Sequence, residues 1–299
     1  MINFKDRVAI VTGAGNGLGR THALALASRG ARVVVNDFGR QKDGSGECTE
    51  AANSVVEEIR LAGGEAIANS ANVADFEQVQ SMVNQAMEQW GRVDILVNNA
   101  GILRDKSFSG ANLTDLKAVL DVHLMGSINC CKAVWDIMKA QEYGRIVMTS
   151  SSSGLYGNFG QSGYGAAKMA VIGLMNTLVI EGAKYNVKVN AIAPTAATRM
   201  TEDVIAEKTV LEKFKPEHIS AGLVALCCEE SPNRMILSCG AGGFSKVRIT
   251  ETAGIIFQDD DISPESVLGN IGAVTQSQPD DAEFQLGMEQ FMKYANLAK

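Results

Sequence analysis

The sequence has few prolines and no segment of low complexity. Only 5 of the 299 residues are proline, and the 30 glycines are spread along the chain. Disordered segments are usually rich in proline and polar residues and poor in apolar ones, so this composition argues against long disordered regions. Because 46% of the residues are hydrophobic, we expect a packed globular chain, with either two domains or one large domain and an extension.

Clusters of basic residues and long apolar runs are also missing. The 27 basic residues are interspersed among 34 acidic ones, which gives a net charge of −7. A protein that binds nucleic acid usually carries a basic patch, so nucleic acid is not an expected partner. The longest apolar stretches, such as 31–35, fall far short of the roughly 18 residues of a membrane-spanning helix, and no membrane contact is expected.

Targeting signals and metal-binding patterns are absent as well. The start, MINFKDRVAIVTG, lacks the layout of a signal peptide, and the end, NLAK, is not the peroxisomal address S-K-L. We therefore expect a cytoplasmic protein, which would be peroxisomal only as an excised module of a longer chain. The cysteines form no C-x-x-C pair and no zinc-like spacing with histidine, so no metal is expected. They are interpreted as buried reduced thiols: Cys48, Cys130, Cys131, Cys227, Cys228 and Cys239.

Short apolar runs alternate with longer amphipathic stretches over most of the chain. This alternation predicts an α/β fold, a doubly wound parallel (Rossmann) sheet covered by helices on both faces. Strands are expected near 7–13, 31–37, 65–73, 93–101, 144–151 and 187–194, and helices near 17–29, 51–62, 76–90, 113–141 and 164–184. The pattern weakens after residue 232. We expect a core domain over 1–240 and an extension over 241–299, packed on the core and ending in a helix near 283–296.

The first predicted strand runs into a glycine-rich turn, TGAGNGLG, that opens the first helix. Backbone N–H groups at a helix N-terminus bind a pyrophosphate well, and glycines let the phosphates approach closely. A tight structural turn would use the same glycines, but the position between first strand and first helix favours a dinucleotide site. The residues expected to bind the cofactor here are Gly13, Asn16, Gly17, Leu18 and Gly19.

Two other strand ends carry candidate cofactor contacts. The second strand ends at Asp37, where a carboxylate can accept hydrogen bonds from the ribose hydroxyls and would repel a 2′-phosphate, which favours NAD over NADP. A turn or capping role would also suit Asp37, and Arg40 close by could receive a 2′-phosphate. The fourth strand ends at 98–101, NNAG, where Asn99, Ala100 and Gly101 are small or amide residues expected at the same sheet edge.

The reactive groups are predicted downstream. Tyr164 and Lys168 are four residues apart and should share one face of a helix. A nearby ammonium would lower the pKa of the phenol towards neutrality, as a general acid or base in an alcohol–ketone interconversion requires. Ser151, thirteen residues before Tyr164 at the end of the fifth strand, could hydrogen-bond the reacting oxygen.

The order and spacing of TGxxxGxG, NNAG, Ser151 and YxxxK resemble the short-chain dehydrogenase/reductase family over roughly residues 5–240. The resemblance implies hydride transfer between NAD and a substrate carbon. It also implies that Tyr164 donates or accepts the proton, that Lys168 binds the nicotinamide ribose and tunes the tyrosine, and that Ser151 positions the substrate oxygen.

The chain departs from this family pattern at several positions. Thr198 stands where a family threonine contacts the carboxamide, but the usual Pro-Gly before it reads Pro-Thr. His123 replaces a catalytic asparagine, which is thought to act mainly through its backbone carbonyl, so the proton relay could survive; a histidine satisfied within its helix is the alternative. Asn72 and Val73 replace the Asp-Val that usually touches adenine, which keeps a hydrogen-bonding side chain without the charge.

Longer strings, including NNAGILRDKSF, DVHLMGS and IAPTAATRMT, are similar to a subfamily, the dehydrogenase modules of multifunctional β-oxidation enzymes, and the similarity extends into 241–299. It implies NAD-dependent interconversion of a (3R)-hydroxyacyl-CoA and a 3-oxoacyl-CoA from fatty acids or steroid side chains. Arg104, Lys106 and Arg199 are candidates to contact CoA, although surface charges are usually only solvated.

Three other functions are compatible with the sequence. The chain could be a hydroxysteroid dehydrogenase of the 17-beta type or a biosynthetic 3-oxoacyl reductase, although Asp37 counts against the second because such reduction generally uses NADPH. It could also be a catalytically silent NAD-binding module, which an intact serine, tyrosine and lysine disfavour. The segment 196–216 is expected to form a mobile lid. The family pattern suggests a homodimer through the helices near 113–141 and 164–184.

Overall fold

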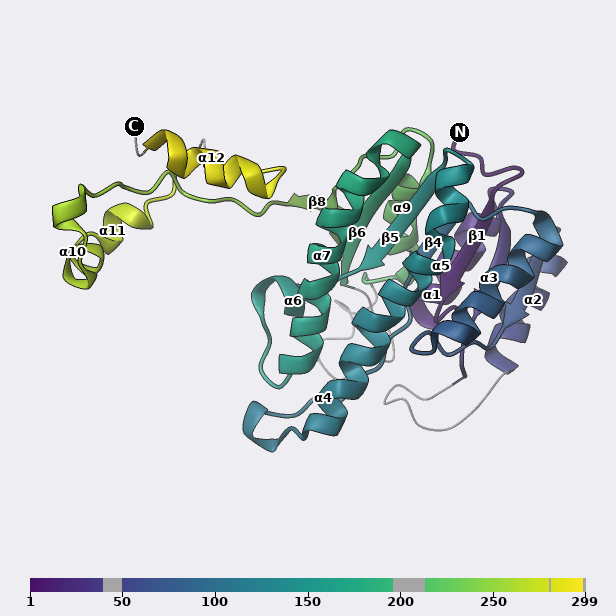
Figure 1. Ribbon diagram of the computed structural model, residues 1–299. Coiled ribbons are helices and arrows are strands. Elements are labelled where there is room, and N and C mark those ends of the chain that lie inside the picture. The colour runs from purple at the N-terminus through teal and green to yellow at the C-terminus, as the bar shows by residue number, and fades with distance from the viewer. Residues whose placement is uncertain (40–49, 196–212, 280, 298–299) are drawn as a thin grey trace. The chain divides into compact units, whose positions relative to one another are not determined.

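The computed structural model describes residues 1–39, 50–195, 213–279 and 281–297 (Figure 1). The strands of this part form one sheet in the order β3-β2-β1-β4-β5-β6-β7-β8, and the pairs from β3 to β7 are all parallel. The bounds are Val8–Thr12 (β1), Arg32–Asn36 (β2), Ala66–Asn69 (β3), Ile95–Asn98 (β4), Gly144–Thr149 (β5), Val187–Thr195 (β6), Ile236–Gly240 (β7) and Gly243–Val247 (β8). The six expected strands and the doubly wound fold are confirmed.

The last two strands were not predicted. Their sequence, ILSCGAGGFSKV, is rich in glycine and small polar residues and lacks the long apolar run of a strand buried on both faces. Ala241 and Gly242 connect them with backbone φ angles of 48° and 84°, as a two-residue hairpin turn requires. A two-residue connection only joins antiparallel strands, so β8 ends the sheet as a hairpin partner of β7.

Helices cover both faces of this sheet. Helices α1, α2 and α9 pack on one face, and α3, α5 and α7 pack on the other (Figure 1). Their bounds are Gly17–Ala27 (α1), Glu50–Leu61 (α2), Phe76–Trp90 (α3), Leu113–Leu120 (α4), Gly126–Ala140 (α5), Ser152–Tyr156 (α6), Ser162–Gly182 (α7) and Pro216–Cys227 (α9), with short 3-10 turns at Phe108–Gly110 and Ala183–Tyr185. The helix expected at 113–141 is present, but a π-helical turn, Asp121–Met125, separates α4 from α5.

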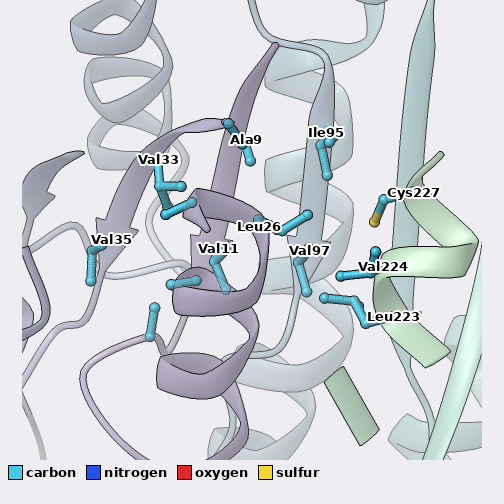
Figure 2. Close-up of a cluster of buried hydrophobic side chains, with 14 of the residues drawn as sticks. Ala9, Val11, Leu26, Val33, Val35, Ile95, Val97, Leu223, Val224 and Cys227 are labelled. Carbon is cyan, nitrogen blue, oxygen red and sulfur yellow. The ribbon is translucent and has the colours of Figure 1, made fainter. Parts of the chain in front are cut away.

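The core lies on both sides of the central strands. Ala9, Val11, Val33 and Val35 alternate along β1 and β2 and all point towards α1 (Figure 2). Each is completely buried. The residues between them are buried as well, against the other helix layer, as expected for parallel strands covered on both faces. The five cysteines within the described residues are also buried with free thiols, as predicted.

Helix α7 is long and apolar, although no membrane contact was expected from the sequence. Residues 162–185, which comprise α7 and the turn after it, have the length and the mean hydropathy, 1.3, of a membrane-spanning helix. Helix α7 packs against β5 and β6, and its residues Val171, Ile172 and Met175 are buried. An apolar helix against a parallel sheet is typical of an α/β core, so we interpret α7 as a core helix.

The chain divides into two compact units, Met1–Lys246 and Val247–Lys299. The second unit holds α10 (Pro264–Gly269), α11 (Ile271–Val274), α12 (Gly287–Leu297) and a 3-10 turn at Asp259–Asp261. Lys293 of α12 donates to a carboxylate oxygen of Glu251 at 2.8 Å and to the carbonyl oxygen of Thr252 at 2.6 Å. Helix α12 corresponds to the helix expected near 283–296, although it begins four residues later, and packing of this extension on the core stays a prediction.

Candidate active site

The direction in which the strand order runs reverses between β1 and β4. In doubly wound sheets, ligands bind outside the carboxyl ends of the strands at such a switch point. Gly13 and Gly17 have φ angles of 63° and 52°, which L-residues with a Cβ rarely adopt. A Cβ at Gly19 would overlap the carbonyl oxygen of Gly13 and lie 2.5 Å from Nδ2 of Asn99. The turn therefore needs glycine for its own geometry.

The N-terminus of α1 opens from this turn. Asn16 is its N-cap residue, yet its side chain makes no capping hydrogen bond, so the first-turn N–H groups are not covered by a side chain. Leu18 packs against the hydrophobic core and anchors the first turn. Free amides at the positive end of a helix suit a pyrophosphate, and binding of one at this glycine turn stays a prediction.

Asp37 lies beside the turn, directly after β2. Its Oδ2 accepts a hydrogen bond from the N–H of Gly15 at 2.8 Å, and its Oδ1 accepts one from the N–H of Gly39 at 2.8 Å. A Cβ at Gly15 would lie only 2.7 Å from Oδ2. Each carboxylate oxygen keeps a lone pair that could accept a ribose hydroxyl. Arg40, the alternative phosphate ligand, lies outside the described residues.

The NNAG segment holds the glycine turn from the other side. The N–H groups of Asn99 and Ala100 both donate to Oγ1 of Thr12 at 3.0 Å. Nδ2 of Asn99 donates to the carbonyl oxygens of Thr12 and Gly13 at 2.8 and 3.0 Å. The structure therefore gives Asn99 a supporting role under the turn. Thr12 was missed in the sequence analysis, although its position as the last residue of the first strand was a usable signal.

Asn72 and Val73 lie in the turn before α3. Oδ1 of Asn72 accepts from the N–H of Ala74 at 3.1 Å, which shapes the turn. The carbonyl oxygen of Val73 accepts from Nδ2 of Asn129 on α5 at 2.9 Å. Asn129 was not predicted, because a single asparagine within a helix gives no sequence signal. These contacts hold the segment where the family pattern places adenine, and adenine contact stays a prediction.

Ser151, Tyr164 and Lys168 come together as predicted. Ser151 follows β5 and is the N-cap residue of α6, where its Oγ accepts from the N–H of Ser153 at 3.2 Å. Tyr164 lies in the first turn of α7 and makes a side-chain hydrogen bond with Ser151. Lys168, one turn later, is buried, and its Nζ donates to the carbonyl oxygen of Thr149 at 2.6 Å. The three side chains therefore converge from the junction of β5 with α6 and from α7.

The electrostatics of this group correct one prediction. Burial raises the pKa of Tyr164, the hydrogen bond from Ser151 lowers it, and the charge of Asp105 raises it further. The net direction is upward, the opposite of the shift expected from Lys168. Burial also lowers the pKa of Lys168 to about 7, and its Nζ bonds Thr149, 5.6 Å from the centre of the Tyr164 ring. The lysine charge is therefore weakened and directed away from the phenol.

His123 lies in the π-helical turn and packs edge-on against Tyr164, with ring centres 5.1 Å apart. Its Nε2 lies 2.8 Å from the carbonyl oxygen and 3.1 Å from the backbone nitrogen of Ile102, so the ring is fixed by the segment after β4 rather than by its own helix. A Cβ at Gly101 would overlap this ring. Burial lowers the pKa of His123 to about 3, which keeps the imidazole neutral.

The backbone carbonyl of His123, the atom expected in a proton relay, accepts a hydrogen bond from Oγ of Ser127 at 2.7 Å. One lone pair is left for a further donor. A relay through this atom stays a prediction. Among the CoA candidates, Arg104 and Lys106 both pair with the carboxylate of Asp115, which reduces their availability to an anion. Thr198 and Arg199, with most of the expected lid at 196–216, lie outside the described residues.

Comparison with known proteins places the chain in a family. Residues 7–209 match the short chain dehydrogenase family, and the chain belongs to it. The fold, the glycine turn and the group formed by Ser151, Tyr164 and Lys168 agree with that assignment. Members of this family are oxidoreductases, so the chain is an enzyme of the type that acts on secondary alcohols.

Several relatives carry informative names. The chain is 47% identical to peroxisomal multifunctional enzyme A of Dictyostelium discoideum over 90% of its length, and 48% identical to peroxisomal multifunctional enzyme type 2 of Mus musculus, also over 90%. It spans only 60% and 36% of the lengths of these two proteins. A Mycobacterium tuberculosis protein named as a short-chain type dehydrogenase/reductase is 46% identical over 86% of this chain and 90% of its own length.

Solved structures give the same assignment. Full-length peroxisomal multifunctional enzyme type 2 from Drosophila melanogaster is 39% identical, with a TM-score of 0.83 over 99% of this chain and 50% of that one. A 7 alpha-hydroxysteroid dehydrogenase, solved with NADH and 7-oxo glycochenodeoxycholic acid, is 27% identical, with a TM-score of 0.72 over 81% of this chain and 95% of that one. The resemblance to the multifunctional subfamily is therefore confirmed.

Proposed function

We propose that the chain is an NAD-dependent dehydrogenase that interconverts a (3R)-hydroxyacyl-CoA and a 3-oxoacyl-CoA, in the β-oxidation of fatty acids or steroid side chains. The observation that supports this most is the similarity of about nine tenths of the chain to multifunctional peroxisomal enzymes, together with an assembled group of Ser151, Tyr164 and Lys168. The whole activity of those longer relatives is not implied, because the chain matches only part of them.

The residues present fit a nicotinamide dinucleotide. The glycine turn has no room for side chains, the first turn of α1 presents amides without a side-chain cap, and a fixed carboxylate stands beside them. Asp37 supports NAD over NADP, because its negative charge would repel a 2′-phosphate and its free lone pairs suit ribose hydroxyls. When bound, the nicotinamide supplies the hydride acceptor or donor.

The chain's own residues then handle the proton and the substrate oxygen. In the oxidation direction, Tyr164 in its deprotonated form takes the proton from the substrate hydroxyl, and Ser151 donates a hydrogen bond to the same oxygen as it becomes a carbonyl. The N–H of Ser153 occupies a lone pair of the Ser151 oxygen, and the Ser151 O–H, which is directed at Tyr164, would turn to the substrate oxygen when substrate binds between the two residues. Lys168 is held beside this group by its hydrogen bond to the carbonyl oxygen of Thr149, and its lowered pKa of about 7 lets it lose or regain a proton near neutral pH.

A stereospecific assay tests this proposal. Purified protein is offered (3R)- and (3S)-hydroxyacyl-CoA of several chain lengths, each with NAD or NADP, and reduced cofactor is followed by absorbance. The proposal predicts turnover with the (3R) isomer and NAD only. Turnover of the (3S) isomer, or a clear preference for NADP, would contradict it.

A hydroxysteroid dehydrogenase is the second candidate, supported by the structural similarity to the 7 alpha-hydroxysteroid dehydrogenase. The same assay includes steroid ring alcohols as substrates, and activity on these alone would favour the second candidate. A biosynthetic 3-oxoacyl reductase is less well supported, although a 3-oxoacyl-[acyl-carrier-protein] reductase of Synechocystis is 45% identical over 67% of the chain, because Asp37 disfavours NADPH. A silent NAD-binding module would show no turnover with any alcohol.

A further inference from the structure

A hydrogen-bonded pair outside the predicted site joins two loops beside Tyr164. Gln161, the residue before α7, donates from Nε2 to Oδ2 of Asp105 at 2.6 Å, and Asp105 lies in the loop after β4. One residue away on each loop, the N–H of Lys106 donates to the carbonyl oxygen of Gly160 at 2.9 Å. A side-chain bond and a backbone bond therefore fasten the loop after β4 to the start of α7.

The same glutamine is bonded on its other side to the segment that carries Ser151. Oε1 of Gln161 accepts from Oγ of Ser153 at 2.6 Å and from Nδ2 of Asn158 at 3.4 Å. The N–H of Ser153 donates in turn to Oγ of Ser151. A continuous chain of hydrogen bonds thus runs from the exposed carboxylate of Asp105 to the hydroxyl that contacts Tyr164.

We propose that Asp105 and Gln161 are positioning residues for the reaction: they hold Ser151 and Tyr164 in their relative orientation, and the negative charge of Asp105 opposes the negative charge that forms on the Tyr164 oxygen. This inference deepens the proposed function, because it rests on Tyr164 as the group that moves the proton. Gln161 sets the relative position of the two catalytic loops through its hydrogen bonds to Asp105 and Ser153. Asp105 in addition makes a negative charge on the Tyr164 oxygen less favourable.

The charges that face Tyr164 support an electrostatic role for Asp105. Among the residues that the structure describes, three titratable groups face it: Asp105 from the loop after β4, His123 from the π-helical turn and Lys168 from its own helix. His123 is neutral above a pH of about 3 because burial lowers its pKa, so it adds no charge in the working range. Burial is the main cause of the raised pKa of Tyr164, and among the described residues Asp105 supplies the negative charge that raises this pKa further.

Two substitutions separate the charge from the geometry. Asp105→Asn keeps a side-chain oxygen that can accept from Gln161 but removes the negative charge, whereas Asp105→Ala removes both. Asp136→Asn is the matched control, because it also removes one exposed carboxylate, from an ion pair with Lys139 on the outer part of α5. Ionisation of Tyr164 is followed by the near-ultraviolet absorbance of tyrosinate, as the difference between each protein and the same protein with Tyr164→Phe. This titration needs no substrate.

The inference predicts that Asp105→Asn moves the onset of Tyr164 ionisation to lower pH by about half a unit at low salt, and that high salt reduces this shift. Asp136→Asn should leave the onset unchanged. An unchanged or higher onset in Asp105→Asn, or an equal shift in Asp136→Asn, would overturn the electrostatic part.

A kinetic comparison tests the geometric part. Asp105→Ala and Gln161→Ala should lower kcat about tenfold with an unchanged KM for NAD, and Asp105→Asn should keep most of the activity. Equal kcat values in Gln161→Ala and the unchanged protein would contradict a positioning role. If no hydroxyacyl-CoA is oxidised by the unchanged protein, the proposed function fails, while the titration still decides the effect of Asp105.

Discussion

At the scale of single residues, the carboxylate of Asp37 is expected to determine the preference for NAD over NADP. Replacing Asp37 with alanine removes the charge that repels a 2′-phosphate and the acceptor bonded to the N–H of Gly15. We expect the KM for NAD to rise about tenfold and kcat/KM for NADP to increase. Asp37→Asn is the conservative comparison, and it should raise the KM for NAD less than Asp37→Ala does. An unchanged ratio of NAD to NADP activity in both variants would refute the role of Asp37.

A second residue-scale prediction concerns the glycine turn. Gly19→Ala places a methyl group against the carbonyl oxygen of Gly13 and against Nδ2 of Asn99, so the turn has to open. We expect NADH, followed by fluorescence titration, to bind more than about tenfold more weakly. Gly173→Ala on α7 is the control, since its Cβ meets nothing within 4 Å and the substitution should leave NADH binding unchanged. Equal affinities in all three proteins would be incompatible with the cofactor site described above.

The residue types in the site could be predicted from the sequence, but their supporting contacts could not. Ser151, Tyr164 and Lys168 follow a recognisable order, and the structure brings them together. The direction of the Tyr164 pKa shift was mistaken because sequence spacing shows that a lysine is near but not that burial affects both groups. Asp105 lies about sixty residues before Tyr164 in the chain, so only the fold reveals that they face each other.

At the scale of helices and strands, a buried histidine connects α1 to α9. Nδ1 of His22 lies 2.8 Å from Oγ of Ser220, and that hydroxyl donates to Oγ1 of Thr21 at 3.0 Å. Burial lowers the pKa of His22 from 6.5 to about 3, so the native imidazole stays neutral in mild acid while the unfolded chain takes up a proton. Stability therefore falls as the pH drops below 6.5, and the fall continues until the native group itself protonates near pH 3.

This linkage gives a measurable difference. Below pH 6.5, each pH unit should cost about 1.4 kcal/mol of unfolding free energy for such a histidine, or about 2 kcal/mol at pH 5. When unfolding is measured with urea, the unfolding free energy of His22→Asn should fall less between pH 7 and pH 5 than that of the unchanged protein, by this amount. His218→Asn is the control, because His218 is exposed on α9. If His22→Asn loses as much stability in acid as the unchanged protein, His22 is not held in its neutral form in the native state.

Element positions were predictable where periodicity was strong. The strands buried on both faces and the helix Phe76–Trp90 were placed well because their apolar residues repeat clearly. The π-helical turn at Asp121–Met125 was not, since a single extra residue within a helix does not change the apolar pattern enough to be seen. The hairpin of β7 and β8 was missed because glycines and exposed polar residues hide a strand at the sheet edge.

At the scale of the whole molecule, we propose a homodimer through the long helices. On α7, Gly165 and Ala167 face the protein interior, but Ile180 is 49% exposed. Ile180→Glu should therefore shift the protein towards monomer in analytical ultracentrifugation, because a charge in an apolar interface is costly to desolvate. Asn84→Glu, on the exposed side of α3, adds the same charge as a control. A monomeric starting protein, or a dimer unaffected by Ile180→Glu, would exclude this interface.

Tyr164 is proposed to move the proton while a nicotinamide cofactor takes the hydride, and its replacement separates these two steps. NADH formation from a (3R)-hydroxyacyl-CoA is measured for the unchanged protein, for Tyr164→Phe and for Tyr156→Phe, a control at an exposed tyrosine. We predict that Tyr164→Phe lowers kcat by about a thousandfold or more while NADH affinity is kept, and that Tyr156→Phe changes neither. Full turnover by Tyr164→Phe would show that Tyr164 does not move the proton.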